Sequence, residues 1–250
     1  MPIQLSIRTD AASLLRGLTT FQREQLPFIT AYALTTTGQM AIDAHKREMR
    51  RVFDRPVDWT VNSLFLTPAK KQDPNPFIRI GFKDFASKGT PAGRYLQWQI
   101  NGGGREHKRF EKALIAAGTM LPGQYAVPTR RLVLDAHGNI PRGTITKILS
   151  DLQSSRDPTQ NRNTARRGRG KLRMLAFFAI TRPGSGLAPG IYLNIGPGQQ
   201  ILVIAYVRQP TYRKRYDWTG ITKRAVEQGF APAFRHAVQF ATRTGRRRAA

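Results

Sequence analysis

The spacing of apolar residues predicts two long helices, one toward each end of the chain. The first spans 24–53, and its basic last turn suits the negative end of the helix dipole. Pro27 is expected in its first turn, where proline costs no backbone hydrogen bond. The second spans 218–244 and is followed by a basic tail that we expect to fray.

Strand-like alternation marks much of the sequence outside these helices. Strands are predicted at 3–7, 64–67, 77–82, 174–181, 191–195 and 201–207, and shorter helices from Ala11, at 110–117 and at 144–152. The segment 92–100 fits either a helix or a strand, and 124–134 is expected to be extended. The predicted fold class is therefore α+β, with a central antiparallel sheet packed by the long N-terminal and C-terminal helices.

The predicted domain organisation is a single domain over residues 1–250 with one insertion. An inserted irregular α/β segment covers about 85–153, and a loop without periodicity follows at about 154–171. That loop is strongly basic, and it carries only one acid, Asp157. We expect it to become ordered when it meets a partner.

Charge changes this picture more than any other property of the composition. The chain has 41 Lys and Arg against 15 Asp and Glu, which gives a formal net charge of +26 and a pI near 11.5. Such a protein attracts polyanions, and nucleic acid is the first to consider. The candidate contacts for nucleic acid or assembly lie in the basic loop, a strand-to-helix junction and the tail: Arg162, Arg166, Arg167, Arg169, Lys171, Arg208, Arg213, Lys214, Arg215, Arg246, Arg247 and Arg248.

The aromatic residues of the junction have two interpretations, which the sequence leaves open. Tyr212, Tyr216 and Trp218 alternate with cations, a pattern that suits stacking on unpaired bases. They equally suit a junction whose aromatic rings seal the core and whose cations are solvated. No helix-turn-helix, zinc-finger or RNA-recognition pattern is present, so any nucleic-acid contact should be electrostatic and sensitive to salt.

Candidate chemistry for catalysis is sparse. The chain has no cysteine, which excludes disulfides, thiolate metal sites and cysteine nucleophiles. It also lacks a phosphate-binding GxxxxGK[ST] loop and a GxSxG nucleophile elbow. Of the four histidines, His45 is expected on a solvated helix face, His137 in a turn and His236 on the C-terminal helix. We therefore expect no catalytic residues, no metal and no cofactor, with a metal-dependent nuclease as an alternative.

The sequence offers nothing that should enter a membrane. No apolar run approaches the roughly 20 residues that a spanning helix needs. The first residues also lack the long apolar segment of a signal peptide. We expect a soluble protein made in the cytoplasm, with no membrane partner.

Three stretches together resemble a known family. They are the helix of small residues and threonines at 31–42, the segment 127–143 with the helix after it, and the C-terminal helix at 221–240. This layout resembles tail-completion or minor tail proteins of tailed bacteriophages, of the minor tail protein Z kind within the neck-protein group. Those proteins are similarly basic, and their smaller members lack or shorten the segment at 85–153.

The resemblance implies a structural virion protein of the tail or neck and no enzyme. It implies a homo-oligomeric ring, commonly a hexamer, at the head–tail joint, in contact with tail-tube or connector proteins. Genomic DNA would pass through its lumen and could be contacted without sequence preference. The alternative function is a sequence-nonspecific nucleic-acid-binding protein that acts as a monomer or dimer.

Overall fold

The chain divides into two compact units in the computed structural model, which describes residues 4–8, 20–86, 89–162, 175–184 and 186–248. For 4–8, 20–24 and 244–248 only the backbone is described. The first unit is Met1–Gly102 with Arg213–Ala250, and the second is Gly103–Tyr212. The helix expected from Ala11 and most of the basic loop, with Arg166, Arg167, Arg169 and Lys171, lie outside the described residues.

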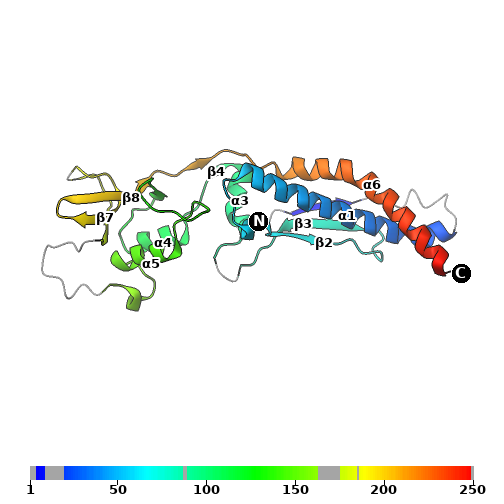
Figure 1. Ribbon diagram of the computed structural model, residues 1–250, viewed down its shortest axis with the longest axis horizontal. Coiled ribbons are helices and arrows are strands. Elements are labelled where there is room, and N and C mark those ends of the chain that lie inside the picture. Colours follow the sequence, from blue (N-terminus) through cyan, green and yellow to red (C-terminus); the bar gives the residue numbers. More distant parts are fainter. Residues whose placement is uncertain (1–3, 9–19, 87–88, 163–174, 185, 249–250) are drawn as a thin grey trace. The chain divides into compact units, whose positions relative to one another are not determined.

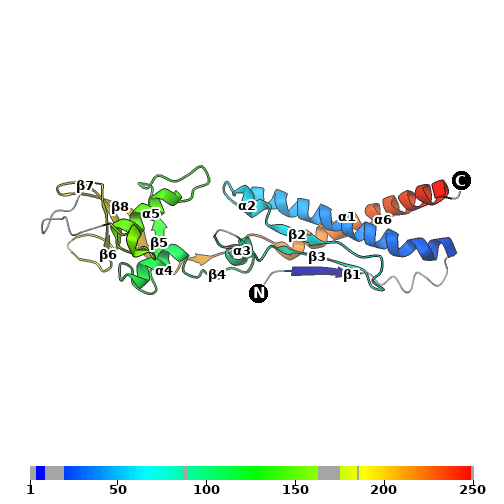
Figure 2. The same cartoon turned by 90° about the horizontal axis from the view of Figure 1, so that it is seen from below.

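The first unit joins two long helices to a small antiparallel sheet (Figures 1 and 2). Its helices are α1 (Thr20–Val52), α2 (Asp58–Val61), α3 (Ala92–Asn101) and α6 (Trp218–Arg248), and its sheet has the order β1 (Gln4–Arg8), β3 (Phe77–Phe82), β2 (Leu64–Thr67). α1 begins earlier than predicted, so Pro27 lies inside the helix and not in its first turn. α6 continues through Arg248, where the sequence predicted a frayed tail.

Small residues bring α1 and α6 close together. Ala33 of α1 packs with Ala233, Ala237 and Ala241 of α6, and all four are almost fully buried. α1 also covers the sheet, and Gly38 makes this contact tight: a Cβ there would lie 2.7 Å from side-chain atoms of Ile78 and Leu66. Leu34 of α1, Ile78 of the sheet and Ile221 of α6 belong to the main apolar core of this unit, and the alanines form a separate cluster beside it.

The second unit is a four-stranded antiparallel sheet covered on one face by two helices. Its elements are β4 (Gly103–Gly104), α4 (Arg109–Ala116), β5 (Tyr125–Pro128), α5 (Arg142–Asp151), the 3-10 turn η2 (Pro158–Gln160), β6 (Phe177–Ile180), β7 (Gly190–Gly196), β8 (Gln199–Val207) and β9 (Thr211–Tyr212). The strand order is β5-β8-β7-β6, and β4 pairs separately with β9.

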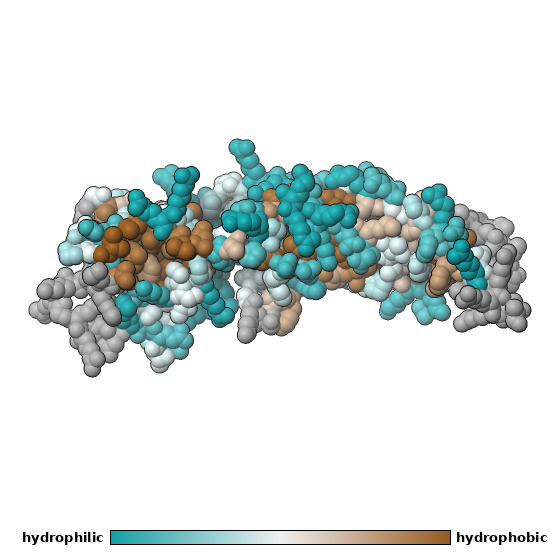
Figure 3. All heavy atoms as spheres, in the orientation of Figure 1, coloured by the Kyte–Doolittle hydropathy of each residue, from teal (hydrophilic) through white to brown (hydrophobic). Residues whose placement is uncertain are grey.

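The core of the second unit is its own. Leu114 of α4 and Ile148 of α5 pack against Phe177, Ile191 and Ile204 of the sheet. On the face seen in Figure 3, apolar surface gathers over β7 and β8, and hydrophilic surface covers α4 and α5. The two cores involve different strands, which is why the chain separates into two units.

The α+β class is confirmed, but the arrangement differs from one central sheet. β6, β7 and β8 fall close to their predicted positions, yet they form a sheet with β5, which pairs with β8, and not with β2 and β3. The second unit covers Gly103–Tyr212, a wider segment than the insertion expected at about 85–153. The physical reason is that alternation identifies a strand without saying which strand it pairs with.

Candidate functional site

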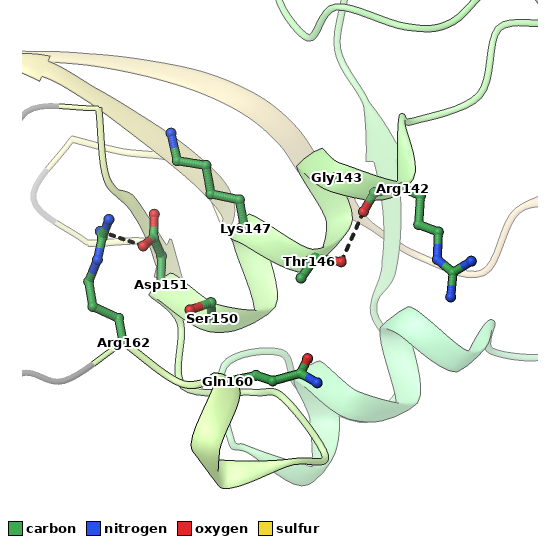
Figure 4. Close-up of a pocket in the computed structure, with 8 residues that line it drawn as sticks. All are labelled: Arg142, Gly143, Thr146, Lys147, Ser150, Asp151, Gln160 and Arg162. Carbon is green, nitrogen blue, oxygen red and sulfur yellow. Dashed lines mark hydrogen bonds and ion pairs between the residues drawn. The ribbon is translucent and has the colours of Figure 1, made fainter.

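A shallow pocket on the second unit brings cations and neutral hydrogen-bonding groups together (Figure 4). Its volume is about 730 Å³. We call it the α5 groove, and it is lined by Arg142, Gly143, Thr146, Lys147, Ser150, Asp151, Gln160 and Arg162. Figure 4 shows Arg142 near one end and Arg162 near the other, with Thr146 and Ser150 between them.

The spacing along α5 explains why these side chains share a face. Residues four apart lie above one another on a helix. Positions 142, 146 and 150 form one row and positions 143, 147 and 151 form the next, while Ile148 is fully buried in the core on another side of the helix. The outer face of α5 therefore forms one wall of the groove.

The opposite wall is held in place by Arg162. Its guanidinium forms an ion pair with Asp151, whose side chain is 2% exposed. Asp151 also accepts a hydrogen bond from the backbone N–H of Phe177 at 3.0 Å, and the N–H of Arg162 donates to the Ser150 carbonyl at 3.1 Å. These bonds tie the segment after η2 to α5 and β6, so one end of the groove is fixed.

The other two cations are less constrained. The ammonium of Lys147 lies 5.5 Å from the centre of the Phe177 ring, a cation–π distance. Arg142 is exposed at the start of α5, and no carboxylate of the described residues lies within ion-pair distance of it. With three cations and one carboxylate, the groove has a net positive charge.

The carboxylates of the second unit are mostly engaged inside it, and Glu111 is the clearest case. It accepts two hydrogen bonds from the buried guanidinium of Arg105, at 2.6 and 2.5 Å, and one each from the N–H groups of Lys108 and Ala126. Burial alone would raise the pKa of Glu111, but these donors outweigh it and hold the pKa below its usual value.

The remaining acids follow the same rule with one exception. Asp135 accepts from the N–H groups of His137 and Asn139, and Asp157 caps η2 by accepting from the Thr159 N–H. Glu106 is exposed. Several exposed cations consequently have no carboxylate at ion-pair distance within the described residues: Arg109, Lys112, Arg130, Arg131, Arg142, Lys147, Arg156 and Arg208.

The structure does not gather the predicted contact residues into one site. Arg162 lies in the α5 groove, and Arg208 is exposed just beyond β8 in the second unit. Arg213, Lys214 and Arg215 are exposed in the first unit. The last turn of α6 includes the backbone of Arg246, Arg247 and Arg248.

The junction aromatics serve the core. Tyr216 is fully buried and Trp218 is 3% exposed, while Tyr212 is half-buried. Arg215 donates to the Gln99 side chain at 2.6 Å. Of the two sequence interpretations, the one in which aromatic rings seal the core beside solvated cations is confirmed for Tyr216 and Trp218.

His45 corrects a prediction, because it lies in the core and not on a solvated face. His45 belongs to α1 and is fully buried against the start of α6. Its ring stacks on that of Trp218, with 4.2 Å between the ring centres. Its Nε2 lies 2.8 Å from Thr222 Oγ1 and its Nδ1 lies 2.8 Å from Tyr216 Oη. Residues four before and four after it, Ala41 and Met49, are also fully buried, and this apolar spacing is the pattern that could have revealed it.

His137 and His236 agree with their predicted places. His137 lies in the turn organised by Asp135, and His236 is exposed on α6. Across the described residues, no three His, Asp or Glu side chains come together in a way that could hold a metal ion. Within the same part of the chain, no helix has both the length and the apolar character needed to cross a membrane.

Arg142 and Lys147 were not among the contact residues predicted from the sequence. The spacing of four residues between positions 142, 146 and 150 is visible in the sequence, where this segment predicts only a short helix at 144–152. Comparisons of the chain with protein-family models, with curated proteins and with solved structures found no match.

Proposed function

We propose that the protein is a non-enzymatic structural component of a tailed-phage virion, a tail-completion or neck protein. In this role it assembles as a homo-oligomeric ring, commonly sixfold, at the head–tail joint. It meets tail-tube or connector proteins there, and DNA passes through the ring.

The observation that carries the proposal is the frame of the first unit. The resemblance implies an N-terminal helix of small residues, a sheet and a closing C-terminal helix. α1 and α6 pack through alanines, and α1 covers an antiparallel sheet. A net charge of +26 has a direct use in such a ring, because cations near the lumen attract the duplex without reading its sequence.

A second candidate function is a sequence-nonspecific nucleic-acid-binding protein. It is favoured by the second unit, where every carboxylate except that of Glu106 is engaged internally while many exposed cations have no carboxylate nearby in the described residues. Such a surface attracts polyanions whether or not the protein belongs to a virion.

Mass spectrometry of purified phage particles tests the first candidate. We expect the protein at a few copies to about a dozen copies per particle, as a ring requires. Its absence from DNA-filled particles would overturn the proposal. Light scattering after gel filtration separates the candidates further, since a protein that coats DNA as a monomer and is missing from particles fits only the second.

A further inference from the structure

We propose that the α5 groove binds the phosphodiester backbone of DNA. The proposal deepens the function given above and rests on it for its setting at the DNA path. It also makes a claim about the isolated protein that can succeed or fail by itself.

The chemistry of the groove matches what proteins use on a phosphate backbone. Most non-specific contacts to DNA come from Arg and Lys, from Ser, Thr and Gln side chains, and from backbone N–H groups. The groove offers three cations with Thr146, Ser150 and Gln160 between or beside them. It lacks an exposed aromatic ring among its lining residues, so it is not built to stack unpaired bases.

The length of the groove favours a polymer over a small anion. From Arg142 to Asp151, α5 rises about 14 Å at 1.5 Å per residue. One strand of a duplex places a phosphate about every 3.4 Å along the helix axis, so the face spans several phosphates. Arg142 lies toward one end of the groove and Arg162 toward the other, so their charges are spread along its length (Figure 4).

Asp151 fits this assignment because it is not free to repel the backbone. Its carboxylate is buried, paired with Arg162 and bonded to the Phe177 N–H. It holds the Arg162 guanidinium at the groove while one quarter of that side chain, 26%, stays exposed. The other carboxylates of the second unit are engaged elsewhere or, in Glu106, absent from the groove lining.

The test measures the affinity of the full chain for a labelled 30-base-pair duplex by fluorescence anisotropy between 50 and 300 mM salt. The groove variant carries Arg142→Ser and Lys147→Ser. The control carries Lys70→Ser and Lys71→Ser, which removes the same charge from exposed positions of the first unit. Circular dichroism confirms that both variants fold.

The groove variant should bind more weakly, and the slope of log K against log salt should fall by about 1.8, the value for two lost phosphate contacts. The control should keep the slope of the natural chain. A second variant, Ser150→Ala with Gln160→Ala, should weaken binding about equally for unrelated sequences without changing the slope.

An equal loss of DNA affinity in the groove variant and the control would overturn the proposal, because net charge alone would then explain the binding. The proposal would also be overturned if polyglutamate with the same charge as the duplex bound more tightly than DNA and lost that affinity in the groove variant. The groove would then be assigned to an acidic protein. The outcome is separate from the virion test: a protein absent from particles can still bind DNA through α5, and a virion protein can fail to bind it there.

Discussion

Acid should destabilise the first unit through His45. Burial lowers the pKa of His45 to about 4, against the opposing effect of the nearby carboxylates of Asp217 and Glu48. The hydrogen bonds agree with a neutral ring. Thr222 donates its own proton to the Trp218 carbonyl, so it accepts from His45 Nε2–H, and Nδ1 is left to accept from the Tyr216 hydroxyl.

The size of the effect follows from the difference in pKa between the two states. In the unfolded chain His45 takes up its proton near pH 6.5, whereas in the folded chain it does so only near pH 4. The unfolded state therefore binds more protons between these values, and the free energy of unfolding falls as the pH is lowered through this window. At 1.36 kcal/mol per pKa unit, the full loss is about 3 kcal/mol.

Urea unfolding followed by tryptophan fluorescence measures this loss in the first unit alone. All three tryptophans, Trp59, Trp98 and Trp218, lie in that unit. The variant His45→Gln, which does not titrate, should lose the pH dependence between 6.5 and 4, and the exposed His236→Gln should keep it.

A direct measurement covers the case in which His45→Gln does not fold. An NMR titration of the natural protein should show one histidine that remains neutral until about pH 4. A His45 that titrates near 6.5, or a His45→Gln variant with the same pH dependence as the natural chain, would refute the reasoning.

Two further predictions concern the second unit, which has no tryptophan and is best followed by hydrogen exchange of β7 and β8. Glu111→Gln should lower the free energy of unfolding by about 3–5 kcal/mol, because it leaves the Arg105 guanidinium buried without its carboxylate. The exposed Glu106→Gln should change it by less than about 0.5 kcal/mol. Equal protection from hydrogen exchange in the two variants would contradict this prediction. Gly190→Ala should lower the free energy of unfolding by about 1–3 kcal/mol, since its Cβ would lie 2.4 Å from the Ile204 carbonyl oxygen. Gly143→Ala has open space around its Cβ and should be neutral or slightly stabilising. Unchanged hydrogen-exchange rates in Gly190→Ala would contradict this prediction, because they would show that β7 and β8 can move apart without loss of stability.

The sequence predicted individual elements better than their assembly. α1, α6 and β6–β8 carry clear periodicity and lie near their predicted positions. The segment 92–100, which fitted a helix or a strand, forms the helix α3, and of the extended segment at 124–134 only β5 is a strand. Pairing depends on contacts between distant residues, so periodicity could not show that β8 lies beside β5.

The candidate site was predicted in part. Arg162 was named for its charge, but its place beside α5 depends on the buried Asp151, which a count of charges treats as any other acid. His45 was expected on a solvated helix face, and its buried hydrogen bonds come from partners more than 170 residues away, Tyr216 and Thr222. The buried neighbours Ala41 and Met49 mark a buried face in the local sequence, but that spacing does not identify the distant partners.

The pairing of β4 with β9 has a consequence for how the chain folds. Gly103 and Tyr212, the first and last residues of the second unit, are opposite one another in this ladder. Once the second unit has folded, the chain of the first unit no longer has to close a loop of about 110 residues before α6 can reach α1. The loop-closure entropy saved in this way is about 4 kcal/mol. The folded second unit then holds the two parts of the first unit's chain together. Early folding of Gly103–Tyr212 should therefore accelerate the docking of α6 on α1.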